Sequence, residues 1–330
     1  MIRKRRADAG VLLLNKMMSS ISCLIIDQMH PSIIPMLEGL GIRVSYQPDL
    51  NAGEVKKLLP QYQGLMVRSK IFISGDLLHD AHQLRFVARA GAGVDNIDEA
   101  ALQKKGIALV NAPEGNSDAV GEFAVGLLLA LFRNVVKADA EVRAGQWYRE
   151  ANRGEEIMGK TIGLIGYGHM GKAFARRLAG FDCRVLAYDK DPAIHSDAYA
   201  RVVALPDLFA ETDVLSLHIP YTPENRHFAD EAFFRLFEKD IWLMNLARGE
   251  VVDQRALVRL LQAGKILGAA LDVLENEKLS TLTAAQQEDF RWLAQAPNVV
   301  LTPHIGGWSH QSYVKINEVL TQKIRALLEK

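Results

Sequence analysis

Short apolar runs alternate with helix-period segments along this chain, from about residue 21 to residue 301. Such alternation is typical of an α/β fold, in which helices connect the parallel strands of a sheet. The first series of runs predicts strands over residues 23–26, 43–46, 64–67, 85–89 and 107–110. The segments between these runs predict helices over residues 31–39, 51–59, 74–81 and 96–105.

A long helical segment, residues 117–145, interrupts the alternation before a second series begins. This series predicts strands over residues 161–165, 184–188, 214–217, 241–244, 268–271 and 299–301. Two such series predict two Rossmann-like or flavodoxin-like α/β domains with parallel sheets and an active-site cleft between them. The helical stretch 308–330 has no strand to follow, and we expect it to pack on the first domain.

A glycine motif marks the start of the second series. The strand 161–165 runs directly into Gly166-Tyr-Gly168-His-Met-Gly171, and a helical segment follows. GxGxxG between a strand and a helix is typical of dinucleotide binding. The first glycine permits a tight turn, the second lets a pyrophosphate approach the backbone, and the third lets the helix pack close to the strand. The helix N-terminus supplies N–H donors to the phosphates.

The next strand ends in Asp189. An acid there can hydrogen-bond both ribose hydroxyls and repels a 2′-phosphate, so the pattern predicts NAD rather than NADP, although the adjacent Lys190 weakens this preference. The same glycines also resemble a P-loop that continues into Lys172, but Ala173 stands where a Mg²⁺-binding Ser or Thr is required. A glycine-rich turn without a ligand would leave the acid at the strand end unexplained.

Three ionisable residues follow later strands of the second series: Arg248, Glu277 and His304. Open α/β sheets place their sites at the carboxyl ends of their strands. An arginine can hold a carboxylate with two hydrogen bonds. A histidine can exchange a proton near neutral pH, and a carboxylate beside it stabilises the imidazolium. Each of these residue types also serves as a structural ion pair or cap, so residue type alone leaves the catalytic interpretation open.

The motifs resemble those of the NAD-dependent D-2-hydroxyacid dehydrogenase family, closest to its D-3-phosphoglycerate dehydrogenase-like branch without a regulatory domain. The resemblance covers residues 64–307 in order, and includes Val67-Arg68-Ser69, Asn111-Ala-Pro-Glu-Gly115 and Leu217-His218-Ile-Pro220 besides the segments above. It implies a substrate domain of residues 20–117 and 305–330 and an NAD-binding Rossmann domain of residues 118–304. It also implies a homodimer.

The resemblance implies a mechanism for an NAD-dependent oxidoreductase. Arg248 would bind the substrate carboxylate and polarise the 2-keto oxygen. His304 would donate a proton to that oxygen in reduction and accept it in oxidation, while Glu277 would hold His304 charged and oriented. Hydride would pass directly to or from C4 of the nicotinamide, with hinge closure excluding water.

Further positions follow from the same resemblance. Asp272 and the carbonyl of Ala247 would orient the carboxamide, and His218 with its two successors would line the adenosine side. The substrate-binding residues implied are Arg68, Ser69, Ala92, Gly93 and Val94. The cofactor-binding residues implied are Gly166, Tyr167, Gly168, His169, Met170, Gly171, Asp189, His218, Ile219, Pro220, Ala247 and Asp272, and no metal is expected.

The substrate stays open at this point. Residues 111–115 and 166–171 most resemble the phosphoglycerate dehydrogenase branch, which favours 3-phosphoglycerate and 3-phosphohydroxypyruvate. Arg68 and Lys70 would meet the phosphate, and the alternative for Lys70 is an ordinary solvated surface charge. Glyoxylate or hydroxypyruvate reduction is the alternative, and an NAD-sensing corepressor-like binding protein is an alternative of another class. Because the sequence ends at Lys330, we expect no regulatory C-terminal domain.

Composition narrows the partners and the compartment. Lys plus Arg and Asp plus Glu each number 39, so a zero net charge argues against nucleic acid and anionic membranes as partners. Two cysteines form no zinc pattern or disulfide framework, which favours a reducing, cytoplasmic location. The longest apolar run, residues 124–132, is too short for a bilayer, which needs about 20 residues. We expect residues 1–19 to form a disordered tail rather than a signal peptide.

Overall fold

The computed structural model describes residues 21–329, and the predicted tail, residues 1–19, lies outside the described residues. The chain divides into two compact units. Unit 1 comprises Met1–Asn116 and Ser309–Lys330, and unit 2 comprises Ser117–Trp308. The predicted domain limits fall one residue from the first of these borders and four residues from the second. Residues 305–308 thus belong to unit 2 rather than to the substrate domain to which they were assigned.

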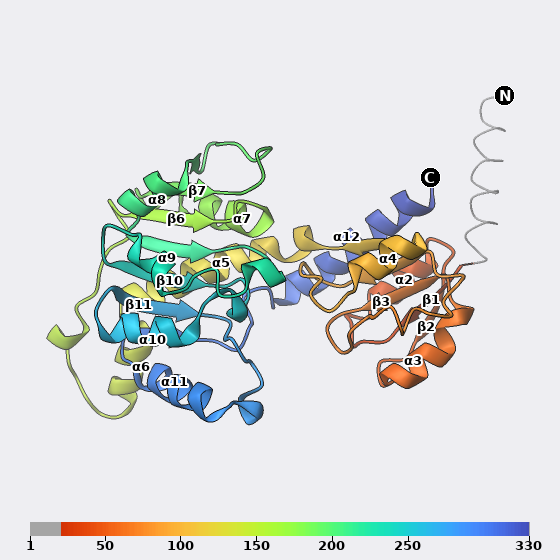
Figure 1. Cartoon of the computed structure of the whole chain (residues 1–330), viewed down its shortest axis with the longest axis horizontal. Coiled ribbons are helices and arrows are strands. Elements are labelled where there is room, and N and C mark those ends of the chain that lie inside the picture. Colours follow the sequence, from red (N-terminus) through yellow and green to blue (C-terminus); the bar gives the residue numbers. More distant parts are fainter. Residues whose placement is uncertain (1–20, 330) are drawn as a thin grey trace. The chain divides into compact units, whose positions relative to one another are not determined.

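Unit 1 is a parallel sheet between two layers of helices (Figure 1). Helices α2 and α12 cover one face of the sheet, and α3 and α4 cover the other. The strand order is β2-β1-β3-β4-β5, formed by β1 (Ser22–Ile25), β2 (Arg43–Tyr46), β3 (Gly64–Val67), β4 (Phe86–Arg89) and β5 (Ala108–Asn111). The helices are α2 (Ile33–Glu38), α3 (Ala52–Leu58), α4 (Glu99–Lys105) and α12 (His310–Leu328).

Local sequence signals explain most helix limits in unit 1. Asn51 and Glu54 form a reciprocal capping box at the start of α3. Gly106 ends α4 in the left-handed region, at φ 68°. The predicted helix 74–81 is wrong, because this segment forms turns. The Ser74 hydroxyl accepts a hydrogen bond from the Leu77 N–H, and such a local bond competes with helical pairing.

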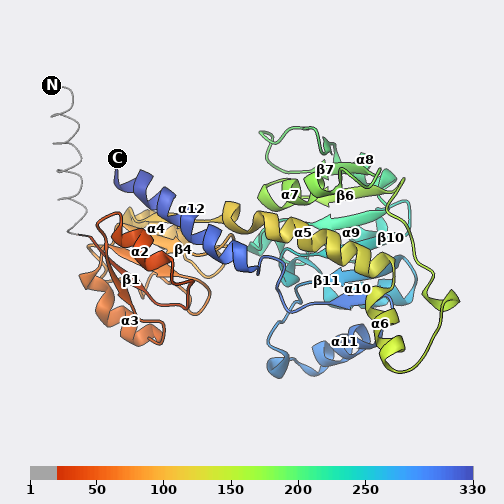
Figure 2. The same cartoon turned by 180° about the vertical axis from the view of Figure 1, so that it is seen from behind.

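Unit 2 contains a larger parallel sheet, also covered on both faces. Figure 2 shows α5 and α7 against one face, and Figure 1 shows α8, α9 and α10 against the other. The strand order is β12-β11-β10-β9-β6-β7-β8, formed by β6 (Thr161–Ile165), β7 (Arg184–Tyr188), β8 (Arg201–Val202), β9 (Val214–Leu217), β10 (Ile241–Asn245), β11 (Ile266–Leu271) and β12 (Val299–Leu301). The α-helices are α5 (Pro113–Phe132), α6 (Val135–Arg143), α7 (His169–Leu178), α8 (Leu205–Glu211), α9 (Glu231–Arg235), α10 (Gln254–Gln262) and α11 (Ala284–Gln295). The first four residues of α5 belong to unit 1.

The long helix predicted over residues 117–145 is two helices. Its first part, α5, begins at Pro113, a residue suited to the first helical turn. Asn134 then takes a left-handed conformation at φ 52° and separates α5 from α6. By length and composition alone α5 could cross a membrane, a test that core helices of soluble proteins also pass. In the structure it contributes Ala124, Leu128 and other side chains to the core of unit 2.

The strand order of unit 2 reverses at β6, which has β7 on one side and β9 on the other. In open parallel sheets, ligands bind outside the carboxyl ends of the strands at such a reversal. The glycine motif follows β6 directly, and Asp189 follows β7. Arg248, Glu277 and His304 follow β10, β11 and β12, which are neighbours in the sheet. The fold therefore gathers all these residues along one edge of unit 2.

Candidate active site

His304 and Glu277 form an ion pair at the carboxyl ends of two adjacent strands. The imidazole Nδ1 lies 2.9 Å from Glu277 Oε1 and 3.1 Å from Oε2. Their side chains are 43% and 47% exposed, so the pair is open to solvent and to small solutes. A carboxylate bound to one imidazole nitrogen orients the ring and leaves the other nitrogen for proton exchange.

The turn that carries His304 is built on a buried carboxylate. Asp272, only 2% exposed, accepts hydrogen bonds from the Thr302 hydroxyl (2.7 Å) and from the backbone N–H groups of Ile305 (2.9 Å) and Gly306 (2.8 Å). Its backbone carbonyl accepts a further bond of 2.7 Å from the His304 N–H. His304 itself sits in the left-handed region, at φ 56°. That conformation costs a non-glycine residue about 1–2 kcal/mol, which these bonds offset.

Arg248 follows β10, the strand next to β11. Its guanidinium donates to the Ala247 carbonyl at 2.7 Å, and its own carbonyl accepts a bond of 3.0 Å from Asn245 Nδ2. The adjoining Gly249 allows a close approach, because a Cβ there would lie 1.9 Å from the Leu274 carbonyl oxygen. The Arg248 turn thus packs directly on the segment that leads to Glu277.

The three glycines of the 166–171 loop meet different surroundings. Gly166 is left-handed at φ 93°, and a Cβ there would lie 2.6 Å from the His218 carbonyl oxygen. A methyl group at Gly168 would meet no described atom within 4 Å, so the backbone there faces open space. Gly171 lies against Gly166, with 2.3 Å between an added Cβ and the Gly166 oxygen. No described side chain caps the N-terminus of α7, whose N–H groups are therefore available to an anion.

Asp189 ties the end of β7 to this loop. Its carboxylate accepts hydrogen bonds from the backbone N–H groups of Tyr167 (2.7 Å) and Asp191 (3.0 Å). The Tyr167 side chain is fully buried, and its hydroxyl donates to Asp197 at 2.8 Å. Burial and the Asp197 carboxylate raise the pKa of Tyr167. Because its side chain is buried, Tyr167 can face a cofactor through its main chain only. Of the next motif residues, His169 is exposed and Met170 is half-buried.

His218 lies at the end of β9, beside the glycine loop. Its Nε2 is 2.9 Å from the Ser216 hydroxyl, and its buried Nδ1 has no hydrogen-bond partner in the described part of the chain. Burial lowers the pKa of His218 to about 4, so the ring is neutral at pH 7. The Ile219 side chain reaches within 3.0 Å of the Cβ position at Gly166, and Pro220 follows it, exposed.

The predicted substrate residues of unit 1 follow the adjacent strands β3 and β4. The Arg68 guanidinium donates to the Gln28 carbonyl (3.2 Å) and the Tyr313 hydroxyl (3.1 Å), and it also lies over the Tyr313 ring. Ser69, the next residue, is exposed. Lys70 donates to the Pro48 carbonyl.

Ala92, Gly93 and Val94 follow β4 as half-buried residues. The Ala92 carbonyl accepts a bond of 2.7 Å from Asn111 Nδ2. Over residues 21–329, no acceptor pairs with the backbone N–H groups of these three residues. Successive unpaired N–H groups are suited to an anion such as a carboxylate.

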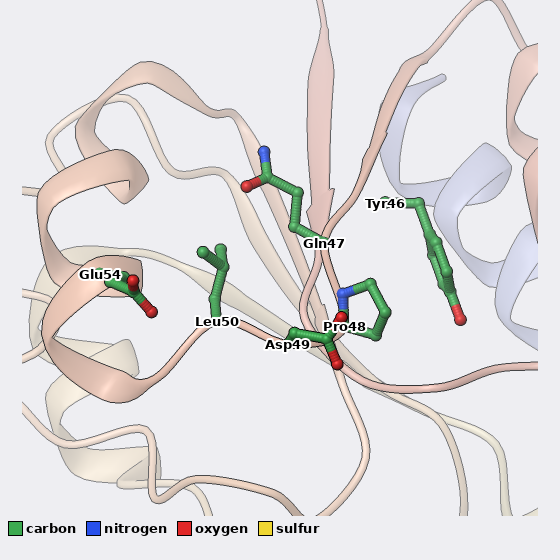
Figure 3. Close-up of a pocket in the computed structure, with 6 residues that line it drawn as sticks. All are labelled: Tyr46, Gln47, Pro48, Asp49, Leu50 and Glu54. Atoms are coloured by element: carbon green, nitrogen blue, oxygen red, sulfur yellow. The ribbon is translucent and has the colours of Figure 1, made fainter.

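A cavity of about 350 Å³ opens elsewhere in unit 1, beside the end of β2 (Figure 3). No predicted site residue lines it, and the Glu54 carboxylate in its wall is committed to the α3 cap. Within residues 21–329, no three His, Cys, Asp or Glu side chains are grouped to hold a metal ion. The cavity is lined by Tyr46, Gln47, Pro48, Asp49, Leu50 and Glu54.

The sequence did not indicate the partners of several site residues. Tyr313 holds Arg68 from 245 positions away, and the pair His227–Glu275 spans 48 positions. Neither carries a local motif. For Asp272, the sequence showed only that an acid and the loop Thr302-Pro303-His304-Ile305-Gly306 follow two predicted strands. It did not show the hydrogen bonds between them.

Comparisons with known proteins identify the family. Residues 125–306 match the NAD-binding domain of D-isomer specific 2-hydroxyacid dehydrogenases. The hydroxypyruvate reductase of Thermotoga maritima is 35% identical over 83% of this chain and 88% of that protein. The D-3-phosphoglycerate dehydrogenase of Methanocaldococcus jannaschii is 33% identical over 93% of this chain and 57% of that protein. A D-lactate dehydrogenase structure from Aquifex aeolicus, complexed with NAD and lactic acid, has a TM-score of 0.79 at 26% identity, covering 93% of this chain and 95% of that one.

The chain therefore belongs to the D-isomer specific 2-hydroxyacid dehydrogenase family, a family of NAD-dependent oxidoreductases. The predicted α/β class with two parallel sheets, the enzyme class and NAD as the cofactor are confirmed. The chain spans little more than half the length of the phosphoglycerate dehydrogenases that it matches.

Proposed function

We propose that this chain interconverts a D-2-hydroxy acid and its 2-keto acid at a site centred on His304. The observation that carries the proposal is the His304–Glu277 pair at 2.9 Å, with Arg248 at the end of the neighbouring strand. Bound NAD supplies or accepts the hydride. The neighbouring positions of an arginine and a histidine–carboxylate pair suit a substrate with a carboxylate next to a carbonyl group.

Arg248, His304 and Glu277 have different roles in the proposed reaction. Arg248 holds the substrate carboxylate and polarises the 2-keto oxygen. His304 gives a proton to that oxygen during reduction and takes it back during oxidation. Glu277 keeps the imidazole oriented and stabilises its charged form. The unpaired N–H groups of Ala92–Val94 and the Arg68–Ser69 segment support a further role in binding the substrate carboxylate.

The cofactor roles are also proposals. The open space at Gly168 and the uncapped N-terminus of α7 support pyrophosphate binding by the 166–171 loop, including the main chains of Tyr167, His169 and Met170. Asp189 would bind the ribose, and His218, Ile219 and Pro220 would line the adenosine side. The Ala247 carbonyl and Asp272 would orient the carboxamide of the nicotinamide. Both already accept hydrogen bonds within the chain, so they would use their remaining lone pairs.

The substrate we propose is hydroxypyruvate or its 3-phosphate. Arg68 favours the phosphorylated acid, as the sequence predicts. Lys70 donates one hydrogen bond to the Pro48 carbonyl and keeps two N–H donors, so this contact does not decide between the phosphorylated and the unphosphorylated acid. The match to a hydroxypyruvate reductase over most of its length supports the unphosphorylated acid.

A panel of 2-keto acids tests the function. NADH absorbance is followed with 3-phosphohydroxypyruvate, hydroxypyruvate, glyoxylate, pyruvate and 2-ketoglutarate. We expect rapid NADH oxidation with at least one of the first three acids. Tight NADH binding without turnover on any acid would contradict the enzyme and favour an NAD-sensing binding protein.

We also propose a homodimer formed through α6 and the segment that follows it. No residue of α6, which is described throughout, is buried. The large hydrophobic side chains that are more than half exposed here are Val135, Val136, Val142, Trp147, Tyr148 and Met158. A second copy of the chain would cover this apolar surface. Light scattering should give twice 36.6 kDa, and Val136→Glu with Trp147→Glu should return the monomer mass. A monomeric parent chain would contradict this proposal.

The compartment and the other partners complete the proposal. Both cysteines lie within the described residues and are free thiols, which supports a reducing cytoplasmic location. The zero net charge supports small molecules, rather than nucleic acid or a membrane surface, as the ligands.

A further inference from the structure

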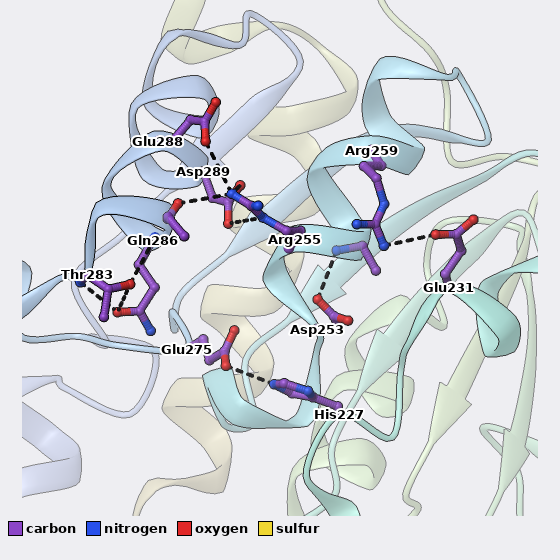
Figure 4. Close-up of polar contacts among 12 residues, drawn as sticks. His227, Glu231, Asp253, Arg255, Arg259, Glu275, Thr283, Gln286, Glu288 and Asp289 are labelled. Carbon is purple, nitrogen blue, oxygen red and sulfur yellow. Dashed lines mark hydrogen bonds and ion pairs between the residues drawn. The ribbon is translucent and has the colours of Figure 1, made fainter.

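We propose that His227 and Glu275 form a positioning pair that holds the Arg248 turn in register with the Glu277 segment. The inference rests on the proposed function. His227 Nε2 lies 2.8 Å from Glu275 Oε1, and Figure 4 shows the two side chains pointing toward one another. They are 35% and 18% exposed, which makes this pair more buried than His304–Glu277.

His227 is joined to the Arg248 turn through its backbone. Its N–H donates to the Glu250 carbonyl at 2.8 Å, and the Ala229 N–H donates to the Val251 carbonyl at 3.0 Å. A parallel bridge between Ala229 and Val252 extends this pairing. The segment 227–229 therefore lies along the chain that starts two residues after Arg248 and is hydrogen-bonded to it.

Glu275 belongs to the segment that leads to Glu277 and packs against the Arg248 turn. It lies two residues before Glu277 and three after Asp272. Its N–H points to the Gln254 side-chain oxygen at 3.4 Å, and the preceding carbonyl, of Leu274, lies against Gly249. Two carboxylates of one short segment are thus each bound by a histidine: Glu275 by His227 and Glu277 by His304.

The backbone at His227 is held in an uncommon conformation. Its φ of 51° lies in the left-handed region, which only a few per cent of non-glycine residues occupy, His, Asn and Asp most often among them. The imidazole is thereby aimed at Glu275 while the N–H of the same residue stays on Glu250. An ordinary surface ion pair would tie side chains alone, whereas His227 joins three segments, two of which carry proposed site residues.

A double-mutant cycle tests the pair. His227→Asn keeps a residue that tolerates the left-handed backbone but cannot reach Glu275, and Glu275→Ala removes the acceptor. Glu275→Gln keeps an acceptor oxygen. His79→Asn is the matched control, because His79 pairs with Asp80 at 2.9 Å on an exposed surface. The readouts are kcat and KM for hydroxypyruvate and the Kd of NADH measured by fluorescence.

We expect His227→Asn to lower kcat/KM by about 10- to 100-fold, because a small misplacement of reacting groups has an effect of that size. The loss should include a higher KM for hydroxypyruvate, since Arg248 shifts, while the Kd of NADH stays unchanged. The double variant should be no worse than the worse single variant. Glu275→Gln should restore most of the activity that Glu275→Ala loses, and His79→Asn should change nothing.

The opposite results would overturn the inference. Losses that multiply in the double variant would show that the two residues act separately. A weakening of NADH binding equal to the loss of kcat/KM would show general damage to unit 2. If His227→Asn does not fold, the comparison of Glu275→Gln with Glu275→Ala decides. An inactive wild-type chain refutes the proposed function, whereas an active wild type with unaffected variants refutes the positioning pair alone.

Discussion

The Gly306 N–H donates a hydrogen bond of 2.8 Å to the buried carboxylate of Asp272 and so closes the turn that carries His304. A Cβ at Gly306 would lie 2.9 Å from that same carboxylate oxygen, so the fit is close. The general acid proposed for the reaction therefore depends on a carboxylate that is only 2% exposed.

Asp272→Asn should destabilise unit 2 and impair turnover together. The Asp272 carboxylate accepts hydrogen bonds on both oxygens, and asparagine replaces one of these oxygens with an NH₂ group. At least one buried donor therefore loses its acceptor, which costs about 1–3 kcal/mol. Urea unfolding monitored by tryptophan fluorescence measures this change. Asp76→Asn is the control, because Asp76 is an exposed carboxylate. Equal unfolding midpoints for wild type and Asp272→Asn would refute the structural role.

His304→Gln should reduce kcat by about 10²–10⁴-fold, the size expected for loss of a general acid. NADH binding should persist, because His304 belongs to the turn after β12 and the 166–171 loop follows β6. Glu277→Gln should also lower kcat, but by less, since Glu277 acts on the substrate only through His304. Stopped-flow NADH oxidation and a separate NADH titration check both variants. A parallel loss of NADH binding would indicate damage to the fold instead.

Substitution by alanine should weaken NADH binding at Gly168 and lower the stability of the fold at Gly166. Gly168→Ala adds a methyl group in open space, so stability should hold while the Kd of NADH rises at least about tenfold. Gly166→Ala forces a side chain into the left-handed region and against the His218 carbonyl, which costs about 1–3 kcal/mol from strain alone. Thermal melts and NADH titrations separate the two effects. An unchanged Kd in Gly168→Ala would argue against pyrophosphate binding here.

Asp189→Asn should narrow the preference for NAD over NADP. The substitution keeps an oxygen that can accept the Tyr167 N–H bond, and it removes the charge that repels a 2′-phosphate. The ratio of kcat/KM for NADH to that for NADPH measures the preference, with Asp191→Asn as control. A ratio equal to that of the wild type would assign cofactor choice to another residue.

Acid should destabilise unit 2 through His218. Burial lowers the pKa of this histidine from 6.5 to about 4. The unfolded chain binds this proton at a higher pH than the folded chain does, so the free energy of unfolding falls as pH decreases from 6.5 toward 4. His218→Asn should flatten the dependence of the urea midpoint on pH across that window. The exposed His82→Asn serves as control, and an unaltered slope in His218→Asn would contradict the assignment.

Strong periodic signals made most of the fold predictable. Strands β2, β3, β6, β7, β9 and β12 have the predicted limits. The reason is clearest for β3, β6 and β9, which are mainly apolar and fully buried. The helix predicted over residues 74–81 failed where Ser74 bonds locally, and the break at Asn134 required a backbone conformation that composition does not reveal. The two-residue strand β8 is too short to have a period.

The candidate site divides in the same way. The strand-end rule placed Glu277 and His304 on neighbouring strands, and their contact follows from the parallel order. The hydrogen bonds that hold them do not follow from the sequence. His227 and Glu275 meet only because segments 227–229 and 250–253 pair with one another, and such pairing between loops leaves no pattern in the sequence.

The division of unit 1 into two stretches of chain determines when that unit can be completed during protein synthesis. Helix α12 supplies Ile316, Leu320 and Ile324 to one face of its core, yet these residues leave the ribosome after all of unit 2. At about 5–20 residues per second, the first stretch waits on the order of ten to forty seconds with only α2 on that face and the area of α12 uncovered. Unit 2, encoded without interruption, can fold during this interval, so the nascent chain needs protection for its oldest sheet.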